Sequence, residues 1–498
     1  MSKPSAVLSP PCWPLLLGSL LLGPAACQEP PPGPATAPSE PGADTAPKPS
    51  PLPRELTEVL AAYAAKVAAS AVFVSDRTLD SVRAEEFAPD GALQALARPF
   101  LQFEVDREAR AVTASLLGSK ATAVFVPGLG CTLANGASPA TLRARALPEP
   151  DPTPPRDGPW PLGDDAEVPA LPDDVDADAL GAALDFAFAD REGRAPARTR
   201  AVVVCRDGRL LAERYAAGYD RDSVLPGWSM TKTWVLALLG LRVRDGALDP
   251  DAALPVPEWQ QDPLDPRRAL RLWHLLRMHS GLAWTEDYEA PQSDALRMLF
   301  ASSDYAGVAA AQPLAAAPAT VHRYSSGTTN LLCRILRATF RDDAAYRAYP
   351  HDRLFAPLGM RSAVLEPDPS GTFVGSSFGF ATARDWARFG QFLLQDGVQD
   401  GERLLPAGWV DAAREPAAAS RRGGYGGHLW LNAGAADAPA DRPMPELPRD
   451  LFYLSGYEGQ YVVVLPTERL VLVRLGCTRS GGFSLGGFVQ RVLAACAK

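Results

Sequence analysis

Apolar and polar positions in the C-terminal two thirds of the chain form short runs near both ends of that region and follow a helical period between them. The short apolar runs typical of strands are Ala201–Cys205, Arg209–Tyr215, Gln460–Leu465 and Leu470–Leu475. Asp207-Gly208 joins the first two runs and favours a tight hairpin turn. Helices are predicted over 179–192 and 485–495. Early and late hairpins around a helical insert predict one antiparallel sheet closed by both ends of a domain spanning 178–498.

The N-terminal third predicts a smaller α+β unit between two proline-rich segments. Its alanine-rich stretch Leu56–Ser70 indicates a helix. The runs typical of strands are Ala71–Ser75, Phe103–Ser115 and Ala121–Pro127. We place this unit at 55–147 and the flanking linkers at 28–54 and 148–177, because proline dominates there and no apolar period is visible. The fold class is therefore α/β (α+β), and no residue of the small unit indicates a particular role.

Residues 1–27 have the layout of a secretory signal, with Lys3 before a short apolar stretch and small residues after it. Cys27 follows Ala25-Ala26 as in a bacterial lipoprotein cleavage box, where this cysteine becomes lipidated. A plain signal peptide cut near Ala26 and a retained anchor are the alternatives. We expect an exported protein, periplasmic or anchored in the outer membrane, that meets a membrane only through such an anchor.

The composition narrows the classes of partner and cofactor. The 498 residues carry 49 Lys+Arg against 58 Asp+Glu, a net charge of -9 without a basic block, which argues against nucleic acid as a partner. Seven cysteines in a chain of this length do not form a disulfide framework, and their pairing cannot be read from spacing. No two histidines stand at metal-ligand spacing with a carboxylate on one helical face, so we expect no metal. We expect no organic cofactor either, because the serine chemistry considered next needs none.

Ser229 and Lys232 give the strongest chemical signal. Three residues apart on a helix, they share one face with their side chains in contact range. Burial lowers the proton affinity of a lysine, which can then take the hydroxyl proton of a neighbouring serine. The residues after Lys232 are apolar on all sides, as in a buried helix, and Lys232 is the single lysine between Lys120 and Lys498. The alternative is a surface helix that starts with Ser229 as its N-cap.

Two tyrosines could complete such a site. Tyr324 lies in the polar turn His322–Gly327, where its hydroxyl could extend a proton relay. The alternative for Tyr324 is a packed aromatic ring with a hydrated hydroxyl. Tyr457 lies in the glycine-rich segment Leu454–Gln460, where a strand edge could present a backbone N–H to a developing oxyanion. The alternative there is a simple turn.

Taken in this order, these residues resemble the serine β-lactamase-like hydrolases related to class C β-lactamases, and most closely the 6-aminohexanoate-dimer hydrolase and esterase branch. The resemblance covers 178–498. It includes the stretches Leu275–Leu282, Trp284–Tyr288 and Gly379–Gly390. It implies a β-lactamase/penicillin-binding-protein-like domain, with an antiparallel sheet and a helical region, that hydrolyses small esters or short amides. It also implies Ser229 as the acylated nucleophile, with Lys232 and Tyr324 as general base and general acid.

The same resemblance assigns substrate contacts and shows two departures. It implies an oxyanion hole made by the backbone N–H groups of Ser229 and Tyr457, and substrate contacts for Tyr288 and Ser326. Ser326 stands where the class C motif Tyr-x-Asn has its asparagine. The class C Lys-Thr-Gly motif has no counterpart, so the cationic anchor for a β-lactam or D-Ala-D-Ala carboxylate is missing unless Arg479 replaces it. Efficient penicillin hydrolysis is therefore disfavoured.

Three other interpretations remain at this point. A Ser-His-Asp hydrolase would place Ser229 in a nucleophile elbow, but Gly227–Thr231 lacks the closing glycine of that motif. The chain has five histidines, so a triad stays possible. A catalytically inactive lipoprotein that binds cell-envelope material could use the same scaffold. D-Ala-D-Ala peptidase or β-lactamase activity is the third alternative.

Overall fold

The computed structural model describes residues 52–89, 95, 97–148, 158, 160–161, 163, 170–290, 292–435, 437–479 and 481–497. These residues belong to one compact unit, 50–498. The predicted signal segment with Cys27 lies outside the described residues. So does most of each predicted linker, 28–54 and 148–177.

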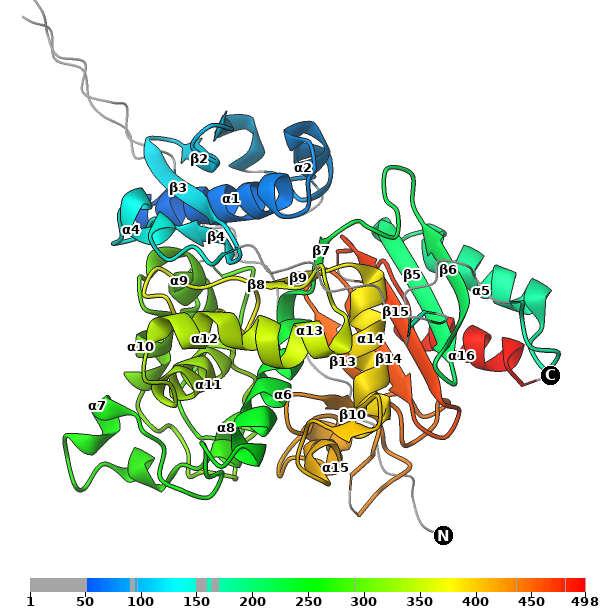
Figure 1. The fold of residues 1–498 in the computed structure, drawn as a ribbon. Helices are drawn as coiled ribbons and strands as arrows, with labels where there is room; N and C mark the ends of the chain where they lie inside the picture. The colour runs from blue at the N-terminus through cyan, green and yellow to red at the C-terminus, as the bar shows by residue number, and fades with distance from the viewer. Residues whose placement is uncertain are drawn as a thin grey trace, which may run out of the picture. The chain divides into compact units, whose positions relative to one another are not determined.

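The main sheet has six antiparallel strands in the order β12-β13-β14-β15-β5-β6 (Figure 1). In that order they are β12 (Trp430–Leu431), β13 (Phe452–Gly456), β14 (Gln460–Leu465), β15 (Leu470–Gly476), β5 (Thr199–Arg206) and β6 (Arg209–Tyr215). β15 pairs with β5, which places Val473 opposite Val203. The φ angles of Asp207 (53°) and Gly208 (68°) are both positive, as a two-residue hairpin turn requires. The predicted sheet, closed by early and late strands, is confirmed.

Helices cover both faces of this sheet. The covering helices are α5 (Ala177–Phe188), α16 (Leu485–Ala495) and α14 (Ala383–Leu394). Successive side chains of β5 point to opposite faces. Val202 therefore packs in the cluster that contains α5 and α16, whereas Val203 packs in the cluster that contains α14. Burial on both faces explains why β5 reads as one uninterrupted apolar run.

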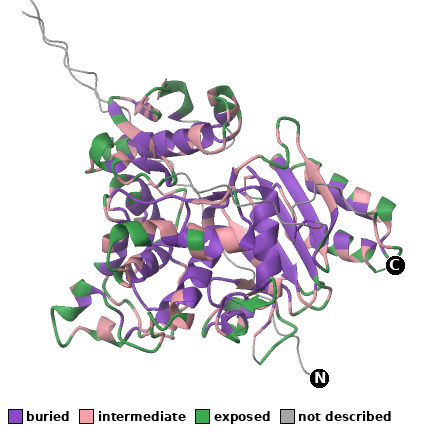
Figure 2. Ribbon diagram, in the orientation of Figure 1, coloured by how far each residue is buried: buried purple, intermediate pink, exposed green. Residues whose placement is uncertain are grey.

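The helical region between β6 and β12 is built around α6 (Thr231–Arg244). Every residue from Thr231 to Leu241 is buried, so the apolar pattern after Lys232 is that of a core helix (Figure 2). The surrounding described helices are α7 (Pro257–Gln260), α8 (Leu272–Leu276), α9 (Asp294–Ala301), α10 (Tyr305–Ala310), α11 (Ser326–Ala338), α12 (Asp343–Pro350), α13 (Ala356–Leu358) and α15 (Trp409–Arg414). A small sheet of β7 (Leu225–Pro226), β9 (Gly379–Ala381) and β8 (Val364–Leu365) leads the chain into Ser229.

The N-terminal α+β part consists of one long helix on a four-stranded antiparallel sheet. Its elements are α1 (Arg54–Phe73), α2 (Leu79–Glu85), β1 (Leu101–Asp106), β2 (Ala111–Leu116), β3 (Ser119–Val126), β4 (Gly130–Leu133) and α4 (Pro139–Arg143). The buried alanines of α1 pack against β2 and β3. Among the described helices, α1 alone is long and apolar enough to cross a membrane, but 67% of its apolar window is buried inside the structure, as in a core helix.

Two predicted strands of this part are wrong. Ala71–Ser75 is not a strand, because Ala71 to Phe73 form the last turn of α1 and the N–H groups of Val74 and Ser75 both donate to the Ser70 carbonyl. Packing of the helix on the sheet overrides the strand preference of these valine and phenylalanine residues. Phe103–Ser115 is not one strand but a hairpin of β1 and β2, closed where the Asp106 carboxylate accepts from Ala109 N–H at 2.7 Å.

A buried ion pair joins the N-terminal part to the helical region. Lys66 of α1 donates to Glu366, and both side chains are almost fully buried. The same carboxylate accepts from Ser70 Oγ at 3.0 Å and from the Cys131 backbone N–H at 2.6 Å. Lys66 Nζ also lies 4.1 Å from the centre of the Phe378 ring. The N-terminal part is therefore attached through a desolvated, fully hydrogen-bonded charge pair.

We expect Lys66→Met to destabilise the protein strongly, because the Glu366 carboxylate stays buried without its cation. The expected loss in the free energy of unfolding is about 3–5 kcal/mol, measured by denaturant titration. Arg54→Met is the matched control on the same helix: its ion pair with Glu58 is exposed (89% and 51%), and its loss should lie within experimental error. Equal stability of Lys66→Met and the control would contradict the importance of the buried pair.

Candidate active site

Ser229 lies in the short helix η2 (Trp228–Met230), immediately before α6. Two features of the backbone fix this turn. A Cβ on Gly227 would come within 2.2 Å of the Trp386 ring, so only glycine fits there. Trp228 has a φ of 47°, a left-handed conformation that bulky residues rarely adopt. Strained residues of this kind are concentrated at functional sites, and here the strain directly precedes Ser229.

Lys232 is the best-connected side chain of the site. Its Nζ lies 2.9 Å from Ser229 Oγ, 3.1 Å from Ser326 Oγ and 2.8 Å from the Ser376 carbonyl oxygen. The side chain is buried (1% exposed). Burial lowers the pKa of Lys232 to about 8, although the Glu286 carboxylate acts in the opposite direction. A substantial fraction of this lysine is therefore neutral near pH 8 and able to accept a proton.

Tyr324 lies beside the same pair, just before α11. Its ring centre is 4.8 Å from Lys232 Nζ, and its hydroxyl lies near the Ser229 side chain. Burial, and then the charge of Glu286, raise the pKa of Tyr324 well above its usual value. The phenol is therefore protonated at neutral pH. The structure thus brings together Ser229, Lys232 and Tyr324, which come from two helix starts about 95 residues apart in the chain.

Glu286 is a charged member of the site to which the sequence analysis gave no role. It accepts hydrogen bonds from Trp284 Nε1 (2.6 Å), Ser326 N–H (2.9 Å) and Ser326 Oγ (2.5 Å). Tyr288 Oη donates to the same carboxylate at 3.1 Å. The signal was present in the stretch Trp284–Tyr288, but only the fold shows that its glutamate faces the start of α11.

Ser326 and Tyr288 belong to this network. Ser326 is fully buried and lies between Lys232 and Glu286, 3.4 Å from Tyr288 Oη. Burial raises the pKa of Tyr288 well above its usual value. Ser326 thus links the lysine to the carboxylate in the place where the class C motif has asparagine. The substrate contacts predicted for these two residues stay predictions.

Tyr457 follows β13 and lies beside η2. Its ring is 5.6 Å from that of Trp228 and stacks on Tyr288 at 5.2 Å. A Cβ on Gly456 would lie 2.2 Å from the Gly227 carbonyl oxygen, so glycine permits the close approach of β13 to the turn that carries Ser229. The predicted oxyanion hole, formed by the N–H groups of Ser229 and Tyr457, stays a prediction.

The structure gives no support to a serine–histidine site. His428 is buried between the Leu276 carbonyl (2.7 Å) and Thr329 Oγ1 (3.1 Å), and burial lowers its pKa to about 3. In the described part of the chain, no hydrogen bond joins a histidine to Ser229. Within the same residues, no group of three or more His, Cys, Asp or Glu side chains is arranged to hold a metal ion.

Cys131, Cys205, Cys333, Cys477 and Cys496 are all unpaired. Burial raises the pKa of Cys333 to about 12, so its thiol stays protonated and is a poor nucleophile. Cys205 and Cys477 are buried.

The chain is similar in sequence to known proteins. Residues 184–483 match the sequence model of the Beta-lactamase family. The 6-aminohexanoate-dimer hydrolase of Paenarthrobacter ureafaciens is 30% identical over 244 residues, which cover 43% of this chain and 56% of that protein. The match thus spans little more than half of that curated relative.

Solved structures are similar at lower sequence identity. A penicillin-binding protein homologue from Caulobacter crescentus is 17% identical, with a TM-score of 0.48, covering 66% of this chain and 99% of its own. A β-lactamase from Mycobacterium bovis is 19% identical, with a TM-score of 0.44, covering 64% of this chain and 100% of its own.

We expect Glu286→Gln to lower the pKa of Lys232, because the carboxylate favours the charged ammonium. The rate at which Ser229 reacts with a fluorophosphonate, measured against pH, should shift to lower pH by up to about one unit. Glu289→Gln, an exposed glutamate three residues later, is the matched control and should leave the profile in place. An unchanged profile, or a shift to higher pH, for Glu286→Gln would show that this charge does not act on Lys232.

Proposed function

The chain belongs to the beta-lactamase family, and from this premise we propose that it is a serine hydrolase that forms an acyl-enzyme on Ser229. The observation that carries the proposal is the 2.9 Å contact between Ser229 Oγ and a lysine whose pKa burial lowers to about 8. A serine hydroxyl is a weak nucleophile unless a nearby base removes its proton. Lys232 in its neutral form is that base.

The two pKa shifts divide the roles of Lys232 and Tyr324. Burial disfavours the charged form of each side chain, which makes the lysine a base and keeps the tyrosine an acid. In acylation, neutral Lys232 takes the proton of Ser229 as Oγ attacks the carbonyl carbon. Tyr324 donates its hydroxyl proton to the leaving oxygen or nitrogen and regains one from Lys232, whose ammonium lies beside its ring. Water then attacks the acyl-enzyme with the same groups acting in reverse.

The developing oxyanion requires donors on the other side of the carbonyl group. We assign this role to the backbone N–H groups of Ser229 and Tyr457. The close approach of β13 to Gly227 and the contact of the Trp228 and Tyr457 rings support the assignment. We further propose that Tyr288 and Ser326 border the bound substrate, because Ser326 contacts Lys232 and Glu286, and Tyr288 contacts Glu286 and Ser326.

The substrate that we propose is a small-molecule ester or short amide. Relatives that bind a carboxylated β-lactam use a lysine in the third motif, which this chain lacks. Arg479 lies beside Tyr457, but its guanidinium donates to Glu458 at 2.6 Å and to Tyr457 Oη at 3.2 Å. Its charge is already balanced by a buried carboxylate, so it is a poor anchor for a substrate anion. Esters and amides without such an anion need no anchor.

The N-terminal sequence adds a proposal on location. The signal-like segment 1–27 and the proline-rich stretch after it support export, lipidation of Cys27 and a site of action in the periplasm or at the outer membrane.

Removing either member of the Ser–Lys pair should remove activity. We expect Ser229→Ala to lower kcat/KM for p-nitrophenyl acetate by about 10⁴-fold or more, and Lys232→Ala by about 10³-fold. Ser303→Ala and Lys120→Ala change exposed residues of the same types and should leave kcat/KM unchanged. Full activity in Ser229→Ala would contradict the assignment of Ser229 as the nucleophile. An inactive wild type that is correctly folded would favour the envelope-binding protein instead.

The pH dependence of hydrolysis should follow the lysine. Because the neutral amine is the base and its pKa is about 8, kcat/KM should rise with pH and level off above pH 8. At pH 6 about 1% of the lysine is neutral, so kcat/KM should be about a hundredfold below the plateau. The test is a pH–rate profile with an uncharged ester. A profile that falls between pH 6 and 8 would require a protonated lysine and contradict this division of roles.

A further inference from the structure

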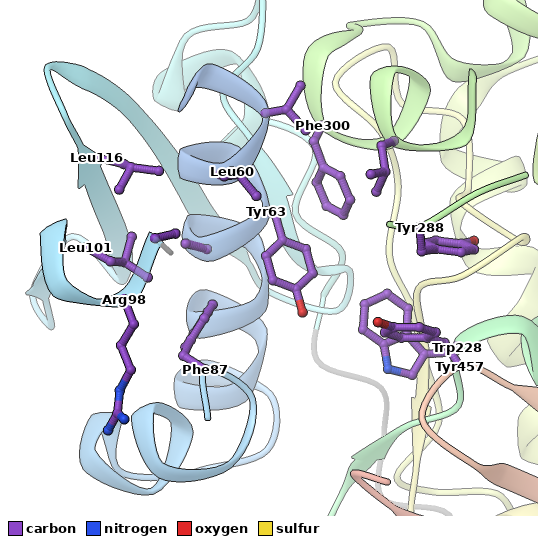
Figure 3. A pocket seen from close by; sticks show the side chains of 14 residues that line it. Leu60, Tyr63, Phe87, Arg98, Leu101, Leu116, Trp228, Tyr288, Phe300 and Tyr457 are labelled. Atoms are coloured by element: carbon purple, nitrogen blue, oxygen red, sulfur yellow. The ribbon is translucent and has the colours of Figure 1, made fainter. Parts of the chain in front are cut away.

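An apolar pocket lies where the N-terminal part meets the helical region. Leu60 and Tyr63 of α1, with Phe87 after α2, line one side of it (Figure 3). Trp228 and Tyr288 line the other side, together with Tyr457. The first three residues lie outside the segment 184–483 that matches the family, whereas the other three lie inside it. One wall of this pocket therefore comes from outside the segment that matches the family.

The pocket adjoins the reacting groups. Trp228 directly precedes Ser229, and Tyr288 Oη lies 3.1 Å from Glu286 and 3.4 Å from Ser326 Oγ, which accepts from Lys232. In Figure 3 the Tyr63 ring extends from α1 toward Trp228 and Tyr457. The pocket is therefore lined by the residue that precedes Ser229 and by a tyrosine that contacts the hydrogen-bond network of Lys232.

The lining favours a hydrocarbon group. Of the 14 residues that line the pocket, Arg98 alone carries a charge, and its side chain points away from the aromatic residues in Figure 3. The space between these residues, counted together with the solvent at its open mouth, is about 730 Å³. Transfer of an apolar group from water to such a lining is favourable, whereas a polar group loses its hydrogen bonds to water there.

Contacts of α1 with the helical region fix the position of the pocket wall that α1 forms. The Tyr63 ring packs edge-on against Phe300 of α9 at 5.3 Å, so α1 touches the helical region on the pocket side. One turn further along α1, Lys66 is paired with Glu366. These contacts set the distance between the two sides of the pocket, and with it the width of the group that fits.

We propose that the N-terminal α+β part forms a binding wall of the active site, and that this wall receives the apolar group of the substrate, a medium-length alkyl chain or an aryl ring. The inference rests on the proposed acyl-enzyme at Ser229 and names the substrate class for that site. It gives residues 54–116 a role inside the hydrolase, in place of a separate binding module. Esters and amides that carry such an apolar group are the substrates that the pocket selects.

The test is a chain-length series measured on the wild type and on variants of one pocket residue. One series of p-nitrophenyl esters extends the acyl chain from two to eight carbons, and one series of acetate esters extends the alcohol in the same way. Each buried methylene should raise kcat/KM about threefold until the pocket is full, so the six-carbon ester should exceed the two-carbon ester by at least tenfold in one series. The series that shows the rise identifies which side of the scissile bond enters the pocket.

Leu60→Trp fills the pocket from α1 and should lower kcat/KM at least tenfold more for the six-carbon ester than for the two-carbon ester. Leu264→Trp, the same substitution at a side chain that is 87% exposed, is the control and should behave as wild type. If Leu60→Trp does not fold, Leu60→Ala carries the test, since it removes contact area and should reduce the preference for the six-carbon ester about threefold or more.

The outcomes separate this inference from the proposed function. Hydrolysis of all esters at equal rates in both series would overturn the binding wall while leaving Ser229 as nucleophile. An equal effect of Leu60→Trp on short and long esters would overturn it as well, because a wall that binds the chain must discriminate length. Absence of hydrolysis together with absence of fluorophosphonate labelling at Ser229 would overturn the proposed function itself.

Discussion

The removal of one lysine side chain from water is the constraint on which the site depends. Moving the pKa of Lys232 from 10.5 to about 8 corresponds to a difference in solvation of about 3 kcal/mol between the charged and neutral amine. The fold supplies this by placing the lysine in the first turn of a helix that is buried on all sides. Ser229, Ser326 and the Ser376 carbonyl oxygen hold the amine in place. Burial of this amine lowers the free energy of unfolding, and it also makes Lys232 able to act as a base near neutral pH.

The surroundings of Lys232 also explain why the N-terminal part belongs to the same body. Glu366 begins a short loop whose backbone returns at Phe378, where Glu366 N–H donates to the Phe378 carbonyl at 2.9 Å. Lys66 binds the first residue of this loop and lies over the ring of the last. The Ser376 carbonyl that accepts from Lys232 lies within the same loop. A single loop thus contacts α1 on one side and the reactive lysine on the other.

Much of this arrangement could be predicted from sequence, and the failures have physical causes. The apolar runs and the Asp207-Gly208 turn predicted the sheet because local patterns determine hairpins. The fully apolar pattern after Lys232 predicted a buried helix for the same reason. Ala71–Ser75 was wrongly predicted as a strand because valine and phenylalanine favour strands. In the structure, packing of α1 on β2 and β3 keeps residues 71–73 helical. A hairpin in Phe103–Ser115 was missed because a four-residue polar turn interrupts the apolar pattern only briefly.

The sequence predicts only those site residues that belong to a recognisable motif. Ser229, Lys232 and Tyr324 belong to recognisable spacings, so their meeting was expected. Glu286 is one of many surface-like glutamates until the fold brings its loop to the start of α11. Likewise, nothing in Leu60 or Tyr63 indicates a pocket, because a pocket is formed by residues distant in sequence. Contacts between residues that are distant in sequence produce no local sequence pattern from which they could be predicted.

The most direct test of the account is to find where an acyl-like group attaches to the intact protein. The protein would be treated with a fluorophosphonate at pH 8, digested, and the modified peptide sequenced by mass spectrometry. The account predicts one adduct, on Ser229, with labelling strongly slowed in Lys232→Ala and absent in Ser229→Ala. An adduct on another serine, or labelling of Ser229 that is as fast without Lys232 as with it, would contradict the claim that the buried lysine activates this serine.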